Sequence, residues 1–551
     1  LSLLFLAAVA CAPAAPLPRV APPAPAALTA TATAQRVVLL SFDGLGADAL
    51  ARQTSLPAFE SLLRDGTVAR VIPVDPCVTS TTHVSILTGA TPQRHGIVSN
   101  RFHLPGDPPE RTARGMETPI DAETLLLAAR RQGKRVGAVT FPTLDATTPE
   151  RTADFGIVWK APLTQARIIT LTRADFRREW VPPTWTERPQ RRASFSPVMR
   201  ARLAWPLPQS THAEVDIVAY DTTDDGSANY DTWRVEAGDE EIAPDARGWF
   251  AVAHQTPEGL TGSWSKLMSA GATLDVTIYA GAVSRTHAYP ESFRAALDRE
   301  IGFWPGPPDE DSEIDPATFA EQIERLADFL TRAQTLAIRT MPFDLLLAYQ
   351  PQVDEAQHNF LGYDDGVIRA AFAAADRAIA AIRGSLDPAH DALVVTGDHG
   401  LVPFDREIRM NRLLEERGFA PRWRAFTSGS VAHLYRFGEP DDGARVAEML
   451  RATGWFELVE MKSPAWHRRS GDIMAYAFPR YELSASSEPP AVAEPQSYGH
   501  HGALNTHREL HTVLLAAGAG VPRATLGEIA QTKIARFVAT LLGIEPPAAA
   551  E

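Results

Sequence analysis

The residues in this sequence that are best suited to chemistry are acids and histidines at a few defined points. Asp43 and the neighbouring Asp398 and His399 each follow an apolar run, which places them at predicted strand ends. Asp354 and His358 stand four residues apart in "DEAQH", a spacing that puts a carboxylate and an imidazole on one face of a helix. Oxygen and nitrogen ligands without thiolate favour zinc, with manganese as the alternative.

Two further histidines occupy the glycine-flanked stretch "YGHHGALN", as His500 and His501. Each motif taken alone has an ordinary structural explanation, because Asp43 can cap a turn and Asp354 with His358 can be a solvated helix pair. Taken together, the motifs predict a metal site.

A cluster of hydroxyl groups forms the second candidate, in "PCVTSTTHVSILTG" at residues 76–89. Ser and Thr are ordinary N-cap residues, so the residues alone leave open whether this stretch holds a nucleophile or only begins a helix. Cys11 and Cys77 are the only cysteines, which excludes a disulfide framework.

Alternating strands and helices are expected to position these groups. Four apolar residues at 37–40 precede Asp43 and predict a strand buried on both faces of a parallel sheet. Helices and strands then alternate in "LPAFESLLRDGTVAR", "DAETLLLAARRQGKRVGAVT", "FDLLLAYQPQVDEAQH" and "DALVVTGDHG". This order predicts a doubly wound α/β fold with a mostly parallel sheet, whose ligands gather beyond the carboxyl ends of the strands.

Two stretches interrupt the alternation. Residues 191–308 contain "AEVDIVAYDTT" and "TLDVTIYAGAV" and predict an inserted β-rich subdomain, while residues 411–488 predict a small α+β cap. The catalytic α/β domain would then consist of residues 35–190, 309–410 and 489–551, preceded by a leader and tether at 1–34.

The leader "LSLLFLAAVAC" is an apolar run that ends in small residues and predicts an export signal, followed by a Pro/Ala tether. "AAVAC" is also similar to the lipobox of bacterial lipoproteins, in which Cys11 would carry a lipid anchor. We therefore expect an exported protein that is periplasmic, extracellular or a membrane-anchored lipoprotein. The net charge of -14 argues against a surface for a nucleic-acid polymer and favours a small-molecule substrate.

The motifs together support a family resemblance. "SFDG", "TSTTHVSILTGATPQRHGIVSN", "VDEAQH", "TGDHG" and "HHGALN" stand in the order typical of the alkaline phosphatase superfamily. The chain most closely resembles its type I phosphodiesterase / nucleotide pyrophosphatase branch, and the resemblance excludes the β-rich insertion. It implies hydrolysis of a small phosphodiester or nucleotide substrate through a phospho-threonine intermediate, with two divalent metal ions, zinc being the expected metal.

The resemblance also assigns roles to individual residues. The branch's nucleophile stands ten residues before the glycine of the "TG" pair, which gives Thr79, with Ser80 as the alternative because "TSTT" replaces the more usual "TFPN". Asn100 stands 21 residues after Thr79 and matches the family's phosphate-binding asparagine. The implied ligands are, for one metal, Asp43, Thr79, Asp398 and His399, and for the other, Asp354, His358 and His501.

Several alternatives bear on this assignment. A formylglycine sulfatase would need Pro and Arg two and four residues after Cys77, where Thr79 and Thr81 stand, so that class is excluded. A phosphomonoesterase or phosphonate hydrolase on the same site, or an inactive exported binding protein, stays open. The remaining members of these motifs are expected to be structural, namely Cys77, His83, His95 and His511.

A preference for diesters is expected from "AVTFPTLDA". Monoester specialists resemble one another in a Lys and Arg pair at this place, whereas Phe141 to Leu144 look like the apolar "WPG" turn of diesterases. Such a turn is predicted to form an apolar wall for the second ester substituent. Arg151 and Lys160 are the nearby cations that could take the place of that pair.

Overall fold

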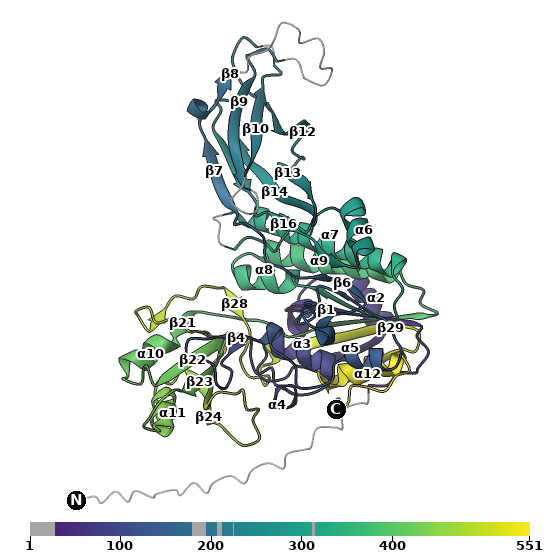
Figure 1. Cartoon of the computed structure of the whole chain (residues 1–551), viewed down its shortest axis with the longest axis vertical. Coiled ribbons are helices and arrows are strands. Elements are labelled where there is room, and N and C mark those ends of the chain that lie inside the picture. The colour runs from purple at the N-terminus through teal and green to yellow at the C-terminus, as the bar shows by residue number, and fades with distance from the viewer. Residues whose placement is uncertain (1–27, 179–193, 207–211, 224, 311–313) are drawn as a thin grey trace, which may run out of the picture.

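The computed structural model describes residues 28–178, 194–206, 212–223, 225–310 and 314–551 (Figure 1). The predicted export signal and lipid anchor at Cys11 lie outside the described residues. Among the described helices, none has the length and apolar character needed to cross a membrane.

A nine-stranded sheet forms the centre of the molecule. Its strands run in the order β17 (His287–Tyr289), β6 (Phe155–Val158), β5 (Val136–Val139), β18 (Leu345–Gln350), β1 (Arg36–Phe42), β19 (Asp391–Gly397), β29 (Thr512–Gly518), β2 (Thr67–Ile72) and β30 (Ala524–Ala530). The strands from β6 to β19 are parallel, whereas β29 runs antiparallel to both of its neighbours. Phe42 pairs with Gln350 and with Gly397, so β1, β18 and β19 end at the same edge of the sheet.

Helices cover both faces of this sheet (Figure 1). Successive residues of β1 point to opposite faces: Val38 and Leu40 pack with α2 (Pro57–Asp65), α7 (Pro316–Thr340) and α9 (Asp365–Gly384). Val37 and Leu39 pack with α3 (Thr79–Thr88), α5 (Leu125–Arg131) and α12 (Lys533–Leu541). Burial on both faces explains the uninterrupted apolar run, because each such side chain stabilises the fold by about 1.5 to 3 kcal/mol. The predicted doubly wound α/β fold is confirmed.

The β-rich part stands on the α7–α9 side of the sheet (Figure 1). One of its sheets has the order β12 (Glu240–Ile242), β11 (Thr232–Ala237), β10 (His212–Tyr220), β9 (Met199–Pro206) and β8 (Arg177–Arg178). The other joins β13 (Trp249–Thr256), β14 (Gly259–Ala270), β15 (Val276–Ala280) and β7 (Arg167–Leu171), with β16 (Ser284–Arg285) paired to β14. The two sheets share one hydrophobic core. The first strand of these two sheets, β7, begins at Arg167, before the predicted insertion at residues 191–308. The domain boundaries themselves stay predictions.

The small cap has its own sheet and core. Its strands run in the order β22 (Trp423–Ser428), β23 (Val431–Arg436), β25 (Ile473–Ala477) and β24 (Phe456–Met461). Two helices, α10 (Met410–Glu416) and α11 (Gly443–Ala452), pack on it. The hairpin between β22 and β23 reaches the catalytic part, where the amide of Ser430 donates to the carbonyl of His501 over 3.0 Å.

Candidate metal centre

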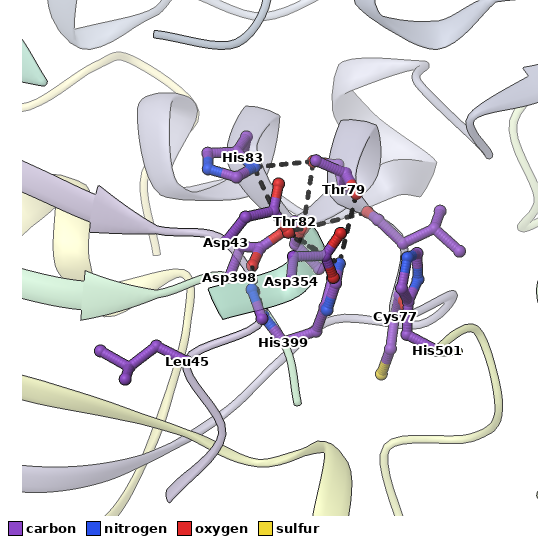
Figure 2. A network of polar contacts seen from close by, with 12 residues as sticks. Asp43, Leu45, Cys77, Thr79, Thr82, His83, Asp354, Asp398, His399 and His501 are labelled. Carbon is purple, nitrogen blue, oxygen red and sulfur yellow. Dashed lines mark hydrogen bonds and ion pairs between the residues drawn. The ribbon is translucent and has the colours of Figure 1, made fainter. Parts of the chain in front are cut away.

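Four predicted site residues converge at the edge where β1 and β19 end. Asp43 follows β1, and Asp398 and His399 follow β19. Nε2 of His399 lies 3.1 Å from Oδ2 of Asp398 and 3.5 Å from Oδ1 of Asp43. Thr79, the first residue of α3, brings its Oγ1 to 3.3 Å from the same nitrogen (Figure 2).

These distances have the size expected around a small metal ion. In a tetrahedral zinc site with bonds of about 2.0 to 2.1 Å, neighbouring ligand atoms lie roughly 3.3 Å apart. The three distances from Nε2 of His399 range from 3.1 to 3.5 Å. Oδ1 of Asp43 is buried and accepts no hydrogen bond from the described residues. Because a buried carboxylate oxygen without a partner is costly, a cation fits this set of donors.

A second group adjoins the first. Asp354 and His358 lie on α8 (Gln352–Phe360), with Oδ2 of Asp354 3.1 Å from Nε2 of His358. Oδ1 of Asp354 is buried and has no hydrogen-bond partner within the described part of the chain. The ring of His501 stacks on that of His399, with centroids 3.7 Å apart. Ligand atoms of Asp354, His399 and His501 lie within 4.8 Å of one another, so His399 stands between the two predicted ligand sets.

Backbone carbonyls orient two of these histidines. Nδ1 of His358 donates to the carbonyl of Gly499 over 2.8 Å, and Nδ1 of His501 donates to that of Cys77 over 3.0 Å. A carbonyl oxygen only accepts, so Nδ1 carries the proton in both rings. In the neutral form of each ring, Nε2 therefore holds the lone pair that a metal-ligating histidine requires.

The electrostatics of the site also favour binding of a cation. Burial, together with the nearby Asp398 and Asp354, raises the pKa of Asp43 well above its ordinary value. Burial opposes ionisation of Asp398 as well, yet His399 and His83 lower its pKa. Three carboxyl groups so close together repel one another when ionised, and a divalent ion would relieve that repulsion.

The pKa of His358 is raised, so protonation of this ring competes with metal binding. Burial alone would lower it, but Asp354 prevails and raises the pKa of His358 to about 9. A bound metal would therefore have to displace a proton from this ring.

Thr79 and its neighbours differ in what their side chains face. Oγ1 of Thr79 faces the cluster, whereas the side chain of Ser80 is buried against Gly115. Oδ1 of Asn100 accepts a hydrogen bond from the backbone amide of Ser80 over 2.8 Å. Nδ2 of Asn100 has no hydrogen-bond partner among the residues described, which leaves it available as a donor beside Thr79.

Two side chains that contact the cluster were not predicted to belong to the site. Nδ1 of His83 lies 3.3 Å from Oδ2 of Asp398, and its position one helical turn after Thr79 is a signal that could have found it. The hydroxyl of Tyr349 donates to Oδ2 of Asp43 over 2.7 Å. No local signal marks Tyr349, because its partner is 306 residues away.

Phe141 and Arg151, on which the expected ester preference depends, are both turned to structural contacts. Phe141 is 2% exposed and packs its edge against His83 at a centroid distance of 5.6 Å, so it supports the cluster from behind and offers no open wall. Nε of Arg151 donates to the carbonyl of Thr143 over 2.7 Å and lies 3.1 Å from Oδ1 of Asp145. Arg151 is thus engaged in holding its own loop.

A cavity of about 790 Å³ lies between the β-rich sheets and helices α7 and α8. Its walls include Trp159, Trp264 and Tyr279, and also Glu355, the residue that follows Asp354 on α8. The volume is in the range of sites for small organic molecules.

Comparison with known proteins identifies the family. Residues 37–203 and 210–504 match the sequence profile of the type I phosphodiesterase / nucleotide pyrophosphatase family. The chain belongs to this family. No match was found among curated protein sequences.

Solved structures share the fold of this family member. Human ectonucleotide pyrophosphatase / phosphodiesterase 5 superposes with a TM-score of 0.53 at 14% identity, covering 93% of this chain and 96% of that chain. An inactive form of the murine protein in complex with AMP gives a TM-score of 0.52 at 14% identity, with coverages of 93% and 96%. Phosphonoacetate hydrolase from Sinorhizobium meliloti, in complex with phosphonoformate, gives 0.50 at 16% identity, with coverages of 94% and 99%. Family membership supports a hydrolase.

Proposed function

We propose that the chain is an exported, metal-dependent hydrolase that cleaves small phosphodiesters or nucleotide pyrophosphates through a phospho-threonine intermediate on Thr79. The observation that carries the proposal is the convergence of Thr79 Oγ1 with His399 Nε2, 3.3 Å apart, beside the carboxylates of Asp43 and Asp398. Family membership supports the same reaction class.

Seven residues would hold two divalent ions, and their oxygen and nitrogen donors favour zinc. The ligands are those predicted from the sequence: Asp43, Thr79, Asp398 and His399 for one ion, and Asp354, His358 and His501 for the other. When bound, such ions supply charge that makes a coordinated hydroxyl more acidic and stabilises negative charge on phosphoryl oxygens.

The protein's own groups account for the remaining steps. The hydroxyl of Thr79 loses its proton and its Oγ1 attacks phosphorus to form a P–O bond, while the bond to the leaving alcohol or phosphate breaks and the leaving oxygen takes up one proton, so that the step is balanced. Nδ2 of Asn100 donates to a nonbridging oxygen, and the N-terminal end of α3 favours the negative charge through the helix dipole. Water then cleaves the phospho-threonine bond and restores the hydroxyl.

The substrate is proposed to be a diester because no cation on the 141–144 loop is available for a second phosphate charge, and Arg151 is held by Asp145 and the Thr143 carbonyl. The cavity beside α8 offers room for an organic substituent. Phosphonate hydrolysis is the second candidate, because a phosphonoacetate hydrolase shares the fold. Export, with or without a lipid on Cys11, completes the proposal.

The test combines metal analysis with a substrate panel. Zinc-loaded protein should contain close to two zinc equivalents and hydrolyse bis-(p-nitrophenyl) phosphate with a higher kcat/KM than p-nitrophenyl phosphate or phosphonoacetate, and a chelator should abolish this activity. His358→Ala should lose about one equivalent of zinc and at least about a hundredfold in kcat.

The matched control is His390→Ala, which removes an exposed histidine that is also paired with an aspartate, Asp387. It should keep both the zinc and the activity. Activity that persists in metal-free protein would overturn the metal-dependent mechanism, and higher kcat/KM on the monoester or the phosphonate would overturn the diester assignment. Absence of hydrolysis on the whole panel would favour a binding protein.

A further inference from the structure

His500 lies against the candidate metal centre without being one of its predicted ligands. Its ring centroid is 4.4 Å from that of His358 and 4.5 Å from that of His501. One ring nitrogen from each of these three histidines lies within 4.8 Å of the other two. His500 is thus close enough to contact whatever these histidines bind.

The orientation of the His500 ring is fixed by its surroundings. The ring lies nearly parallel to that of Phe404, at 18° and a centroid distance of 5.7 Å. On another side, Gly429 of the cap hairpin approaches so closely that a Cβ atom there would lie 2.8 Å from Nδ1 of His500. Nδ1 is on the side of the ring that the hairpin occupies, and Nε2 makes no hydrogen bond to the described residues.

The proton on His500 is placed differently from those on its neighbours. The backbone amide of His501 donates to Nδ1 of His500 over 2.9 Å, so Nδ1 holds a lone pair and the ring proton is on Nε2. In His358 and His501 the proton is on Nδ1, because a backbone carbonyl accepts it. His500 therefore carries an N–H donor on Nε2, whereas the neutral rings of His358 and His501 carry a lone pair on Nε2.

This tautomer argues against a third imidazole ligand. To bind a metal through Nε2, His500 would need its proton on Nδ1, where it would point at the amide hydrogen of His501, whose nitrogen lies only 2.9 Å from Nδ1. An N–H donor at this place suits a bound phosphoryl group, because the oxygens of that group are acceptors and carry negative charge.

We propose that His500 is a substrate-binding residue whose Nε2–H donates to a nonbridging oxygen of the phosphoryl group. The inference rests on the proposed function for the presence of such a group at this centre. It assigns to His500 a role parallel to that of Asn100, which offers its Nδ2 on the Thr79 side.

The test measures binding of inorganic phosphate to the zinc-loaded full-length protein by isothermal titration calorimetry, and zinc content by elemental analysis. His500→Phe keeps a ring for Phe404 and removes the donor, so phosphate affinity should fall about tenfold to a hundredfold, with both zinc equivalents retained. His500→Gln restores an N–H near the position of Nε2 and should bind within about threefold of the unchanged protein. His500→Ala is the second variant without a donor if the phenylalanine disturbs folding.

Three outcomes would overturn the inference: loss of a zinc equivalent from either donor-free variant, which would make His500 a ligand; phosphate affinity in His500→Phe equal to that of the unchanged protein; or no rescue by His500→Gln. The diester assay runs in parallel on the same samples. Weak phosphate binding by His500→Phe together with no hydrolysis by the unchanged protein would count against the proposed function while leaving His500 as a phosphate donor.

Discussion

Thr79 is the residue whose substitution tests the proposed chemistry most directly. Its Oγ1 is 3.3 Å from His399, it begins α3, and the neighbouring Ser80 is turned toward Gly115. The difference between these two adjacent hydroxyls depends on the helix start, so the "TSTT" sequence alone could not separate them.

We expect Thr79→Ser to keep measurable diesterase activity, because it keeps a hydroxyl at that position, and Thr79→Ala to lose at least about a thousandfold in kcat. Ser80→Ala is the matched control and should remain active. Cys77→Ala should also remain active, since burial raises the pKa of that thiol well above its ordinary value and keeps it protonated. A trapped intermediate that mass spectrometry locates on Ser80 would transfer the role.

Asp75 predicts a pH dependence of stability that is separate from the metal centre. Burial raises its pKa from 3.8 to about 6, although the backbone amide of Asn505 donates to it over 2.7 Å. A carboxyl whose pKa is higher in the folded state contributes stability below its unfolded pKa and loses that contribution as pH rises through the folded pKa. The shift corresponds to about 3 kcal/mol lost between about pH 4 and pH 7.

Asp75→Asn does not titrate and should not lose this contribution. The free energy of unfolding of the variant, relative to that of the unchanged protein, should therefore rise by about 3 kcal/mol between about pH 4 and pH 7. Urea denaturation at several pH values measures it. A difference that stays constant with pH would contradict the shifted pKa.

At the scale of elements, the cap hairpin determines where the His500–His501 loop lies. Gly429 adopts φ +60° in this hairpin, and a Cβ atom there would lie 1.9 Å from the carbonyl oxygen of His501. Gly429→Ala should displace the loop and weaken zinc binding by about tenfold to a hundredfold, as loss of a supporting contact to a metal ligand does.

The control for this prediction is Gly418→Ala, in the same cap. Gly418 has φ +75°, and a Cβ atom there would meet nothing within 4 Å. Both variants carry the backbone cost of a left-handed alanine, about 1 to 2 kcal/mol, but only Gly429→Ala meets the loop. Equal zinc affinities in the two variants would show that the hairpin does not position His501.

The same scale explains what the sequence could predict. The apolar run before Asp43 and the one before Asp398 predicted two strands, and their pairing in register brings both acids to one edge. Parallel strands that end together bring the residues that follow them to one edge, so the convergence of these acids could be predicted from the two apolar runs.

The contacts that complete the site depend on the tertiary fold. Tyr349 meets Asp43 only because β18 lies beside β1, and the antiparallel placement of β29 has no local signature. β7 pairs with β15, more than a hundred residues later, which is why its place in the β-rich sheets was not foreseen from residues near Arg167. The tautomer of His500 likewise depends on a loop conformation that no spacing encodes.

At the scale of the whole molecule, the net charge predicts a preference for small phosphodiesters over polymers. The chain has 53 Lys and Arg residues against 67 Asp and Glu residues, a net charge of -14. A polyanion approaching such a molecule is repelled, whereas a small diester carries one charge and feels little of this repulsion. The discrimination between small and polymeric diesters is therefore expected to depend on salt.

We predict that a dinucleotide-sized diester is hydrolysed faster than single-stranded DNA of about 30 nucleotides at equal concentrations of phosphodiester bonds. Raising the salt from about 20 to about 200 mM should increase the rate on the polymer relative to that on the small diester, because screening shortens the range of the repulsion. A protein that binds nucleic acid through clustered cations shows the opposite salt dependence, since its affinity falls as counterions compete. Initial rates on both substrates across this salt range measure the sign. A polymer rate that is the higher of the two at low salt and falls as salt is added would contradict the prediction and point to a nucleic-acid surface on a molecule that is acidic overall.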